Sequence, residues 1–324
     1  KYGYDYYANV RRAEAWASGR FTFAGLDAAV AGRIGYSKFW REGLVRKGLF
    51  PGLDANGEPM SYDGAVITTY DPVTGKAITS LGKSDVKDFL TGAAKLNLSY
   101  VIRGGHRIYA DAAYITDAPT FNQAFVSPRT RNSIVPDLKT SKTLTADLNY
   151  AYSNSGYDVR VTGFYTTIKD QSKVMSFYDD AQNSFTNFAM SGMDERHVGV
   201  ELGFKVPLPV PNLALQGVLS YGQYVYTSNP KMYQTYDNSA AIVEETYGVI
   251  IPYWKSHPTK EGKTVKHYVS GTPQLATSLG LSWNKNYWFV DADVDWFDKA
   301  YLDMNPLYRT DMATAGPDKT VTVT

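Results

Sequence analysis

Cysteine is missing from this chain of 324 residues, and histidine is scarce, with four residues. The missing thiols exclude a disulfide framework and thiolate metal sites. Lysine and arginine together number 33 and the acidic residues 32, so the formal net charge of +1 gives no reason to expect a nucleic-acid partner. The longest apolar runs fall well short of the ~20 residues that a membrane-spanning helix needs. The sequence therefore predicts no helical membrane span.

Tyrosine, by contrast, is abundant, with 26 residues in a chain whose aromatic content is 14%. Few soluble domains carry so much tyrosine, and its ring is useful where one end meets lipid and the other meets water. The mean hydropathy of -0.32 does not argue against a membrane protein, because half of the residues of a β-barrel face a wet lumen.

The clearest alternation of apolar and polar residues runs from Gln274 to Phe297 and predicts a β-hairpin with its turn at residues 284–286. Successive side chains of a strand face opposite sides, so alternation assigns different solvents to the two faces. Tryptophans flank the apolar face, as they do at the two surfaces of a bilayer. The apolar face of this hairpin consists of Leu275, Thr277, Leu279, Leu281, Trp283, Trp288, Val290, Ala292, Val294 and Trp296.

The same alternation recurs in four earlier hairpins, with arms beginning near residues 12, 90, 144 and 198. Short turns join the two arms of each hairpin, and long loops are expected near residues 38–87, 116–141, 168–196 and 223–272. A soluble hairpin, propeller or sandwich also has strands with alternating apolar and polar residues, but its short turns and long loops need not alternate along the chain. The regular alternation of short turns with long loops favours an all-β fold, an antiparallel transmembrane β-barrel with short periplasmic turns and long outer loops.

Both ends of the chain fall on the long-loop side of this arrangement. A complete bacterial barrel is expected to begin and end in the periplasm, and Lys1 to Tyr7 has no apolar core of a signal peptide. We therefore expect residues 1–324 to form one sector of about ten strands, a partial barrel without the plug domain and the terminal strands.

Two segments resemble a known family. Trp296 to Thr310 (WFDKAYLDMNPLYRT) is similar to the motif that precedes the last strands of TonB-dependent outer-membrane receptors, and Phe39 to Pro51 (FWREGLVRKGLFP) is similar to one of their outer loops. The spacing of the hairpins also resembles that of the C-terminal part of these barrels, in the style found in Bacteroidetes.

The resemblance implies a parent barrel of about 22 strands around a plug. Its implied function is import of a scarce solute (a siderophore, cobalamin, glycan or peptide) across the Gram-negative outer membrane, with energy supplied by the TonB complex through the plug. No chemistry on the solute and no cofactor are implied. The expected partners are TonB, the lipid bilayer with its lipopolysaccharide, and a surface lipoprotein or another outer-membrane protein.

Two other function classes stay open at this point. A small outer-membrane barrel could be a hydrolase, and Asp194 with His197 at the outer end of a strand would be its water-activating pair, although a loop hydrogen bond is the simpler interpretation. Alternatively, the barrel could have kept the receptor fold as a structural partner of a larger complex.

The candidate ligand-binding residues lie on the polar strand faces and in the last long loop. Asp291, Asp293 and Asp295 share one face of a strand, with same-face neighbours ~7 Å apart, and could line a solute path or contact a plug. Basic residues predicted on the same face of other strands are Arg33, Lys95, Arg160 and Lys205. The loop at 223–272 is rich in aromatic residues that could stack on a ligand, including Tyr236, Tyr253 and Trp254. The four histidines show no metal-binding spacing, so no metal site is expected.

Overall fold

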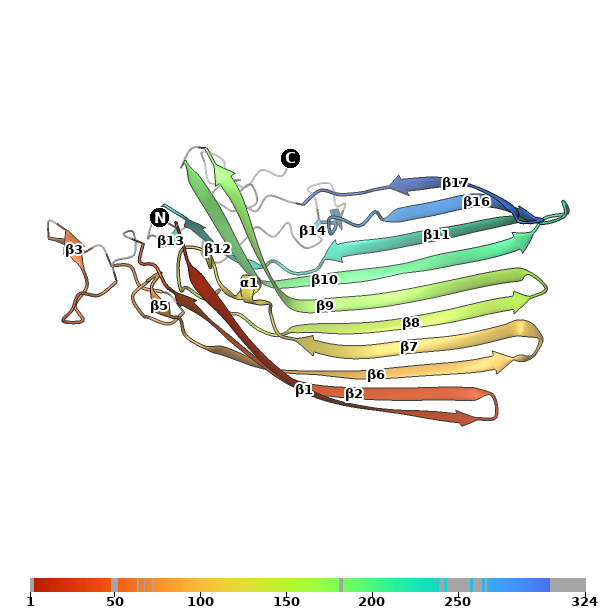
Figure 1. Cartoon of the computed structure of the whole chain (residues 1–324), viewed down its shortest axis with the longest axis horizontal. Helices are drawn as coiled ribbons and strands as arrows, with labels where there is room; N and C mark the ends of the chain where they lie inside the picture. Colours follow the sequence, from red (N-terminus) through yellow and green to blue (C-terminus); the bar gives the residue numbers. More distant parts are fainter. Residues whose placement is uncertain are drawn as a thin grey trace.

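A single long antiparallel sheet dominates the computed structural model of the chain (Figure 1). The structure describes residues 3–47, 52–62, 64–66, 68–71, 73–180, 183–238, 242–243, 257–258, 264–265 and 267–303. The main path of the sheet consists of β1 (Tyr6–Phe23), β2 (Leu26–Gly43), β6 (Lys87–Ile102), β7 (His106–Asp117), β8 (Ser141–Asn154), β9 (Tyr157–Asp179), β10 (Ser184–Pro207), β11 (Leu213–Tyr226), β16 (Leu275–Lys285) and β17 (Trp288–Asp298).

Smaller elements occur between these strands. They are β3 (Ser61–Tyr62), β4 (Ala65–Val66), β5 (Gly82–Lys83), β12 (Lys231–Tyr236), β13 (Ile242–Val243), β14 (His257–Pro258), β15 (Thr264–Val265), the 3₁₀ turn η1 (Arg103–Gly105) and the short helix α1 (Phe121–Ala124). No helix in the described part of the chain is long and apolar enough to cross a membrane.

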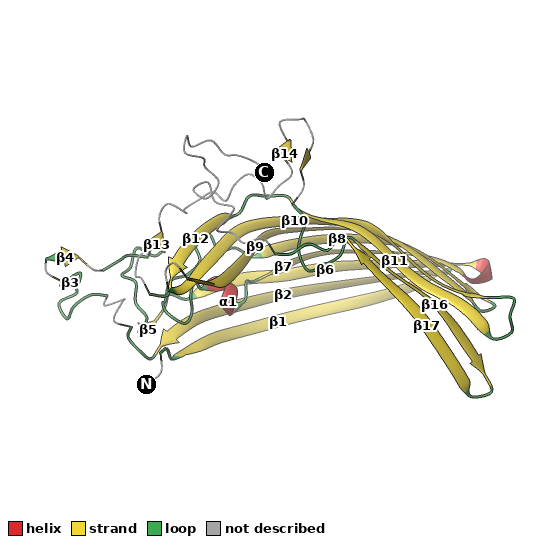
Figure 2. Ribbon diagram, turned by 90° about the horizontal axis from the view of Figure 1, so that it is seen from above, coloured by secondary structure: helices red, strands yellow, loops and turns green. Residues whose placement is uncertain are grey.

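Each strand of the main path pairs with its neighbour in the chain, in the order β1-β2-β6-β7-β8-β9-β10-β11-β16-β17. The five predicted hairpins and the antiparallel all-β class are thereby confirmed. All short turns lie at one end of the sheet and all long loops at the other (Figure 1). The sheet bends into an open arch with β1 and β17 at its two edges (Figure 2).

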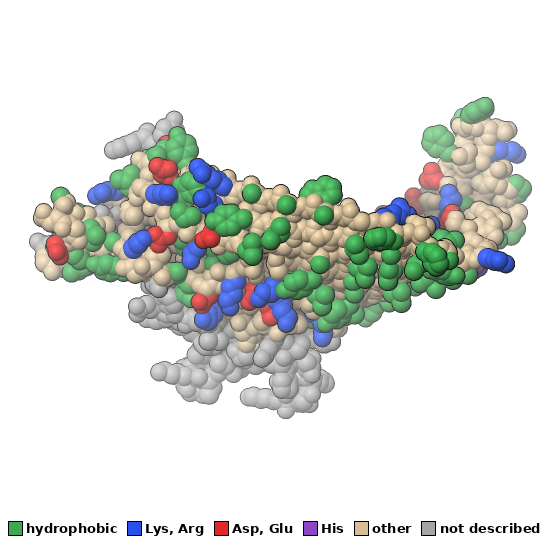
Figure 3. Space-filling view, turned by 90° about the horizontal axis from the view of Figure 1, so that it is seen from below, with side chains coloured by type: hydrophobic (Ala, Val, Ile, Leu, Met, Phe, Trp, Pro, Cys, Tyr) green, Lys and Arg blue, Asp and Glu red, His purple; other side chains and the backbone are tan. Residues whose placement is uncertain are grey.

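The two faces of the arch differ as the alternation predicts. Val200, Leu279 and Val290 are 52%, 51% and 58% exposed. Within the described residues, no helix or second sheet covers the apolar face that they share with the other outward residues. Figure 3 shows hydrophobic side chains gathered over the strands as a band. An uncovered apolar surface of this extent is stable only against lipid or a partner, because monomeric soluble proteins rarely expose one so large.

Tight turns close the hairpins where the sequence places them, with one shift. Ala24 and Gly25 both have positive φ, of 47° and 85°, as a two-residue hairpin turn requires. In the last hairpin, β16 continues through Lys285, and the positive φ values fall on Asn286 and Tyr287. The expected turn at residues 284–286 was therefore placed too early.

The prediction that residues 168–196 form a long loop was wrong. β9 and β10 continue outward and stay paired as far as Asp179 and Ser184, with register shifts between Ser191 and Glu195. This extension carries its own apolar cluster, which contains Phe188, Met190, Met193, Tyr226 and Met232. The regular alternation stops at residue 168 because the extension packs against other protein segments, whereas the rest of the sheet leaves its apolar face uncovered.

The buried core sits under the arch, around the loop of residues 118–140 between β7 and β8. We call this segment the roof loop. Phe125 and Ile134 of the roof loop pack with Phe39 of β2, whereas Val126 and Val135 pack with Ala189 of β10 and Tyr233 of β12. The roof loop thus joins β2 to β10, which are separated in the sheet by four strands. Figure 2 shows α1, at its start, under the outer part of the arch.

Asp303 anchors the residues after β17 to the outer part of β9. Its carboxylate accepts hydrogen bonds from Nζ of Lys173, at 3.0 Å, and from Oγ of Ser270. Burial raises the pKa of Asp303, but these two hydrogen bonds and the charge of Lys173 outweigh burial and lower it below its ordinary value of 3.8. A carboxyl group whose pKa is lowered by folding stabilises the folded state at pH values above its ordinary pKa. This stabilisation is lost as the pH falls through the lowered pKa.

We therefore expect amide hydrogen exchange of residues 299–303, corrected for the intrinsic rate, to rise as the pH falls below 3.8. Asp303→Asn should remove this pH dependence, because the side chain no longer titrates. An equal rise in the variant would show that a different group controls the attachment.

Candidate functional site

The inner face of the arch carries polar side chains that bond to each other across strands. Near β1, Arg33 contacts Glu14 at 3.3 Å and Asp117 at 2.7 Å, so one guanidinium links β1, β2 and β7. Trp16 and Lys95 line the same hollow, of about 320 Å³. Arg33 is thus paired with acidic neighbours at this edge of the sheet, and it does not pair with the aspartates of β17.

A second hollow of about 530 Å³ lies on the inner face from β9 to β17. Arg160 of β9, Glu201 of β10 and Asp295 of β17 line it together with Ser220, Ser278 and Phe297. Cross-strand registry brings these residues to one face, since Arg160 is opposite Gly203, Glu201 is opposite Ser220, and Ser278 is opposite Asp295. We call this the inner hollow. Its lining includes an arginine, two acidic residues, two serines and a phenylalanine.

The three aspartates of β17 share the inner face as predicted, but only Asp295 lines the inner hollow. Asp293 lies over Gly280, where an added Cβ would meet its carboxylate oxygen at 1.8 Å. In the part of the chain that the structure describes, Asp291, Asp293 and Asp295 form no ion pair within 4.0 Å. Their carboxylates are open to the interior of the arch.

Arg160 is the basic candidate that lines the inner hollow together with acidic residues. Its guanidinium carbon lies 5.9 Å from the centre of the Tyr109 ring, in a cation–π arrangement on the inner face. Such a contact fixes the direction of the side chain without neutralising its charge.

The aromatic candidates of the last long loop are separated from the inner hollow. Tyr236 ends β12, where its hydroxyl accepts a hydrogen bond from Nε2 of Gln234 at 3.0 Å. Burial, with Asp179 nearby, raises the pKa of Tyr236. Tyr253 and Trp254 lie outside the described residues, as does the apolar stretch at 248–253. Tyr236 thus belongs to the packing of the outer loops.

The proposed Asp194–His197 pair does not form. His197 Nε2 lies 3.0 Å from Oε2 of Glu195, and the carboxylate of Asp194 accepts the backbone N–H of Asp170 at 2.9 Å. The irregular register of β10 between Ser191 and Glu195 turns the two side chains to different partners. The hydrolase alternative loses the residue pair on which it depended.

Sequence reasoning missed Arg41, the residue that fastens the roof loop. Arg41 is 1% exposed, and its guanidinium donates hydrogen bonds to the carbonyl oxygens of Pro128 and Ser80 and to Oδ1 of Asn132. Tyr6 covers the guanidinium at 4.9 Å. The sequence prediction placed residue 41 in the loop at 38–87, whereas β2 continues to Gly43. The partners of Arg41 come from loops 39 to 91 residues away, which no local pattern reveals.

The inner hollow combines apolar side chains with a few charged and hydroxyl groups, which is the usual composition of a ligand-binding pocket. Among the described residues, no group of three or more His, Cys, Asp or Glu side chains could hold a metal ion.

Comparison with known proteins agrees with this geometry. The solved structure of the copper transporter OprC aligns with 88% of the chain, at a TM-score of 0.51 and 13% sequence identity. The ferric-catecholate import receptor Fiu from E. coli K12 aligns with 90% of the chain, at a TM-score of 0.51 and 12% sequence identity. The chain spans 35% of the length of each of these two proteins. At such low sequence identity, the likeness shows the fold alone. No curated protein sequence matches the chain significantly.

A family model covers nearly the whole chain. Residues 1–322 match the family described as TonB dependent receptor-like, beta-barrel. The match accounts for the antiparallel strands, the sorted turns and loops and the uncovered apolar face. The chain belongs to the TonB-dependent receptor β-barrel family, whose members are outer-membrane receptors and transporters rather than enzymes.

Proposed function

We propose that residues 1–324 form a sector of the barrel wall of an outer-membrane receptor that imports a scarce solute with energy supplied through TonB. The complete barrel would close with about 22 strands around a plug domain, and the plug would contact TonB. The closer resemblance to receptors of the Bacteroidetes type stays a prediction, as does a surface lipoprotein partner.

The observation that carries this proposal is the pairing of an uncovered apolar face with a charged, hydroxyl-bearing inner face on the same strands. Lipid against one face and water against the other is the environment of a transmembrane barrel wall. The roof loop crosses the inside of the arch at its outer end, where a receptor meets an incoming solute.

The inner hollow is the part of the wall best suited to contact a solute during passage. Arg160, Glu201 and Asp295 could pair with charged groups of a siderophore, a peptide or cobalamin, and the hydroxyls could bond to a glycan. The names of the two similar structures refer to copper and to ferric catecholates. Both differ too much from this chain in sequence to transfer a substrate.

The test begins with the full-length protein isolated from the outer membrane. Mass spectrometry would identify the copurified solute, and uptake of that solute would then be compared in cells with and without functional TonB. Import that falls to the background of cells lacking the receptor when TonB is absent supports the proposal. Equal uptake without TonB would contradict it.

Arg160→Ala in the full-length receptor is expected to weaken binding of the identified solute about 10- to 100-fold, since a hydrogen bond to a charged group contributes about 1.5–3 kcal/mol. The measurement is a binding titration with purified receptor. Lys205→Ala, which removes a cation from the same face outside the inner hollow, should leave affinity unchanged. Equal losses in both variants would argue for a general charge effect.

A further inference from the structure

Two transverse rows of side chains line the inner hollow, and each row crosses the five strands from β9 to β17. The first row consists of Arg160, Gly203, Val218, Ser278 and Asp295, and the second, nearer the long loops, of Thr162, Glu201, Ser220, Ala276 and Phe297. The other lining residues, Leu202, Leu219 and Thr277, belong to the outward positions between the two rows. Short side chains thus form the middle of the hollow, and the larger charged and aromatic side chains stand toward its ends.

The charged groups of the inner hollow have no ion-pair partners. Arg160 of β9 and Asp295 of β17 are separated by four strand spacings of ~4.8 Å, which is roughly 19 Å along the sheet. Glu201 lies in the second row, on the strand next to that of Arg160. In the described part of the chain, none of these three residues has an oppositely charged group within 4.0 Å. One positive and two negative groups are therefore available to a ligand.

The β17 end of the inner hollow suits a positively charged group. Phe297 is 65% exposed although its face of the sheet is polar, and Asp295 lies two residues away on the same face. A carboxylate beside an exposed aromatic ring attracts an ammonium or guanidinium group. Oγ of Ser220 donates a hydrogen bond to Oε1 of Glu201 at 3.4 Å, which draws this carboxylate along the second row. A cation over Phe297 thus has Asp295 beside it and Glu201 across the floor of the hollow.

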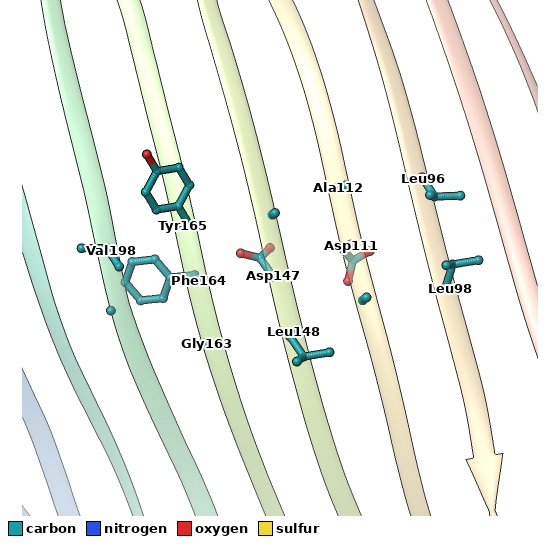
Figure 4. Close-up of a pocket in the computed structure, with 13 residues that line it drawn as sticks. Leu96, Leu98, Asp111, Ala112, Asp147, Leu148, Gly163, Phe164, Tyr165 and Val198 are labelled. Atoms are coloured by element: carbon teal, nitrogen blue, oxygen red, sulfur yellow. The ribbon is translucent and has the colours of Figure 1, made fainter.

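The surrounding inner face disfavours a solute that carries negative charge alone. Asp111 and Asp147 lie directly opposite each other on β7 and β8, and Phe164 follows Asp147 in the same row (Figure 4). Among the described residues, neither aspartate has an ion-pair partner within 4.0 Å, and the same holds for the aspartates of β17. Like charges brought close together exclude wrong partners. An anionic group is therefore better accepted at Arg160 when the same molecule brings a cationic group to the carboxylates.

We propose that the inner hollow binds a zwitterionic solute, whose anionic group lies at Arg160 and whose cationic group lies between Glu201 and Asp295. The ring of Phe297 supports the cation, and the two serines of the floor bond to polar groups in the middle of the solute. An extended chain of five peptide units spans about 17 Å, which is close to the separation of the two ends. This inference rests on the proposed function, and it adds the charge class of the imported solute.

The test uses the full-length folded receptor in non-ionic detergent and pentaglycine as the probe, because the only charges of pentaglycine are its two ends. Isothermal titration compares pentaglycine with its N-acetylated and its C-amidated form. Loss of either charge should weaken binding about 10- to 100-fold, from the usual contribution of a hydrogen bond to a charged group. Glu201→Gln/Asp295→Asn should abolish the effect of acetylation alone, and Arg160→Ala the effect of amidation alone. A merely structural role of these residues would change the binding of all three probes equally.

The matched control is Asp111→Asn/Asp147→Asn, which removes two carboxylates from the inner face outside the inner hollow and should preserve both effects. Loss of the acetylation effect in this control as well would overturn the proposal. Failure of pentaglycine to bind, or equal binding of the three probes to the unaltered receptor, would also overturn it. Uptake is measured separately, so TonB-dependent import of a solute without a cationic group would refute the zwitterion alone. End-specific binding of pentaglycine by a receptor whose uptake does not need TonB would contradict the proposed function alone.

Discussion

Leu279→Arg is expected to cut the yield of folded, membrane-inserted protein strongly. Leu279 lies near the middle of β16, is 51% exposed and points out from the arch. An arginine on the lipid face near the bilayer midplane costs about 2–4 kcal/mol. Folded yield can be measured from the heat-modifiable mobility of the full-length barrel in gels, and stability from a denaturant titration in vesicles.

The control for this prediction is the neighbouring residue. Ser278→Arg introduces the same side chain one position earlier, on the inner face, opposite the carboxylate of Asp295. Its folded yield should stay close to that of the unaltered protein, because water and a carboxylate are available to the guanidinium. Equal yields for the two arginine variants would contradict the assignment of lipid and water to the two faces.

Phe125→Ala is expected to release the roof loop from the wall, at a cost of about 3–5 kcal/mol for truncating a buried phenylalanine. Phe125 is 0% exposed and lies against Phe39 and Phe121, with ring centres 6.4 Å and 4.8 Å away. We expect faster proteolytic cleavage within residues 118–140, with the β-strand signal in circular dichroism unchanged, because the roof loop is attached to the sheet but is not part of it.

Phe289→Ala is the matched control. Phe289 lies at the short-turn end of β17 and is 73% exposed, so its loss should leave cleavage of the roof loop unchanged. If Phe125→Ala left cleavage at the level of this control, the packing of the roof loop against β2 would be weaker than the burial of Phe125 indicates.

The faces of the wall could be predicted from sequence because a strand repeats every two residues. Only one assignment of faces is consistent with the run Leu144, Ala146 and Leu148, which has Thr145 and Asp147 between its members. A register shift of one residue would turn every apolar side chain of the strand from lipid to water. The same reasoning found the five hairpins, while the boundaries of the last turn and of the β9–β10 hairpin moved, since no lipid constrains the pattern beyond the bilayer.

The candidate site was predicted in part. The alternation placed Arg160 and Asp295 on the inner face, but it could not bring them to one hollow, because β9 and β17 are separated in the sheet by three strands and the arch must bend to bring them near. Glu201 was not among the candidates, because a single acidic residue on the polar face of a strand is not distinctive. The pairing of His197 depended on an irregular register that has no clear sequence signal.

The sequence by itself determined the class of the fold, the order of the hairpins and the solvent that each strand face meets, since all three follow from local alternation and loop length. Only the tertiary structure decided that residues 118–140 turn inward to the buried Arg41, and that Arg160, Glu201 and Asp295 line one hollow. These arrangements depend on registry between strands and on contacts between distant loops, and neither leaves a periodic trace in the chain.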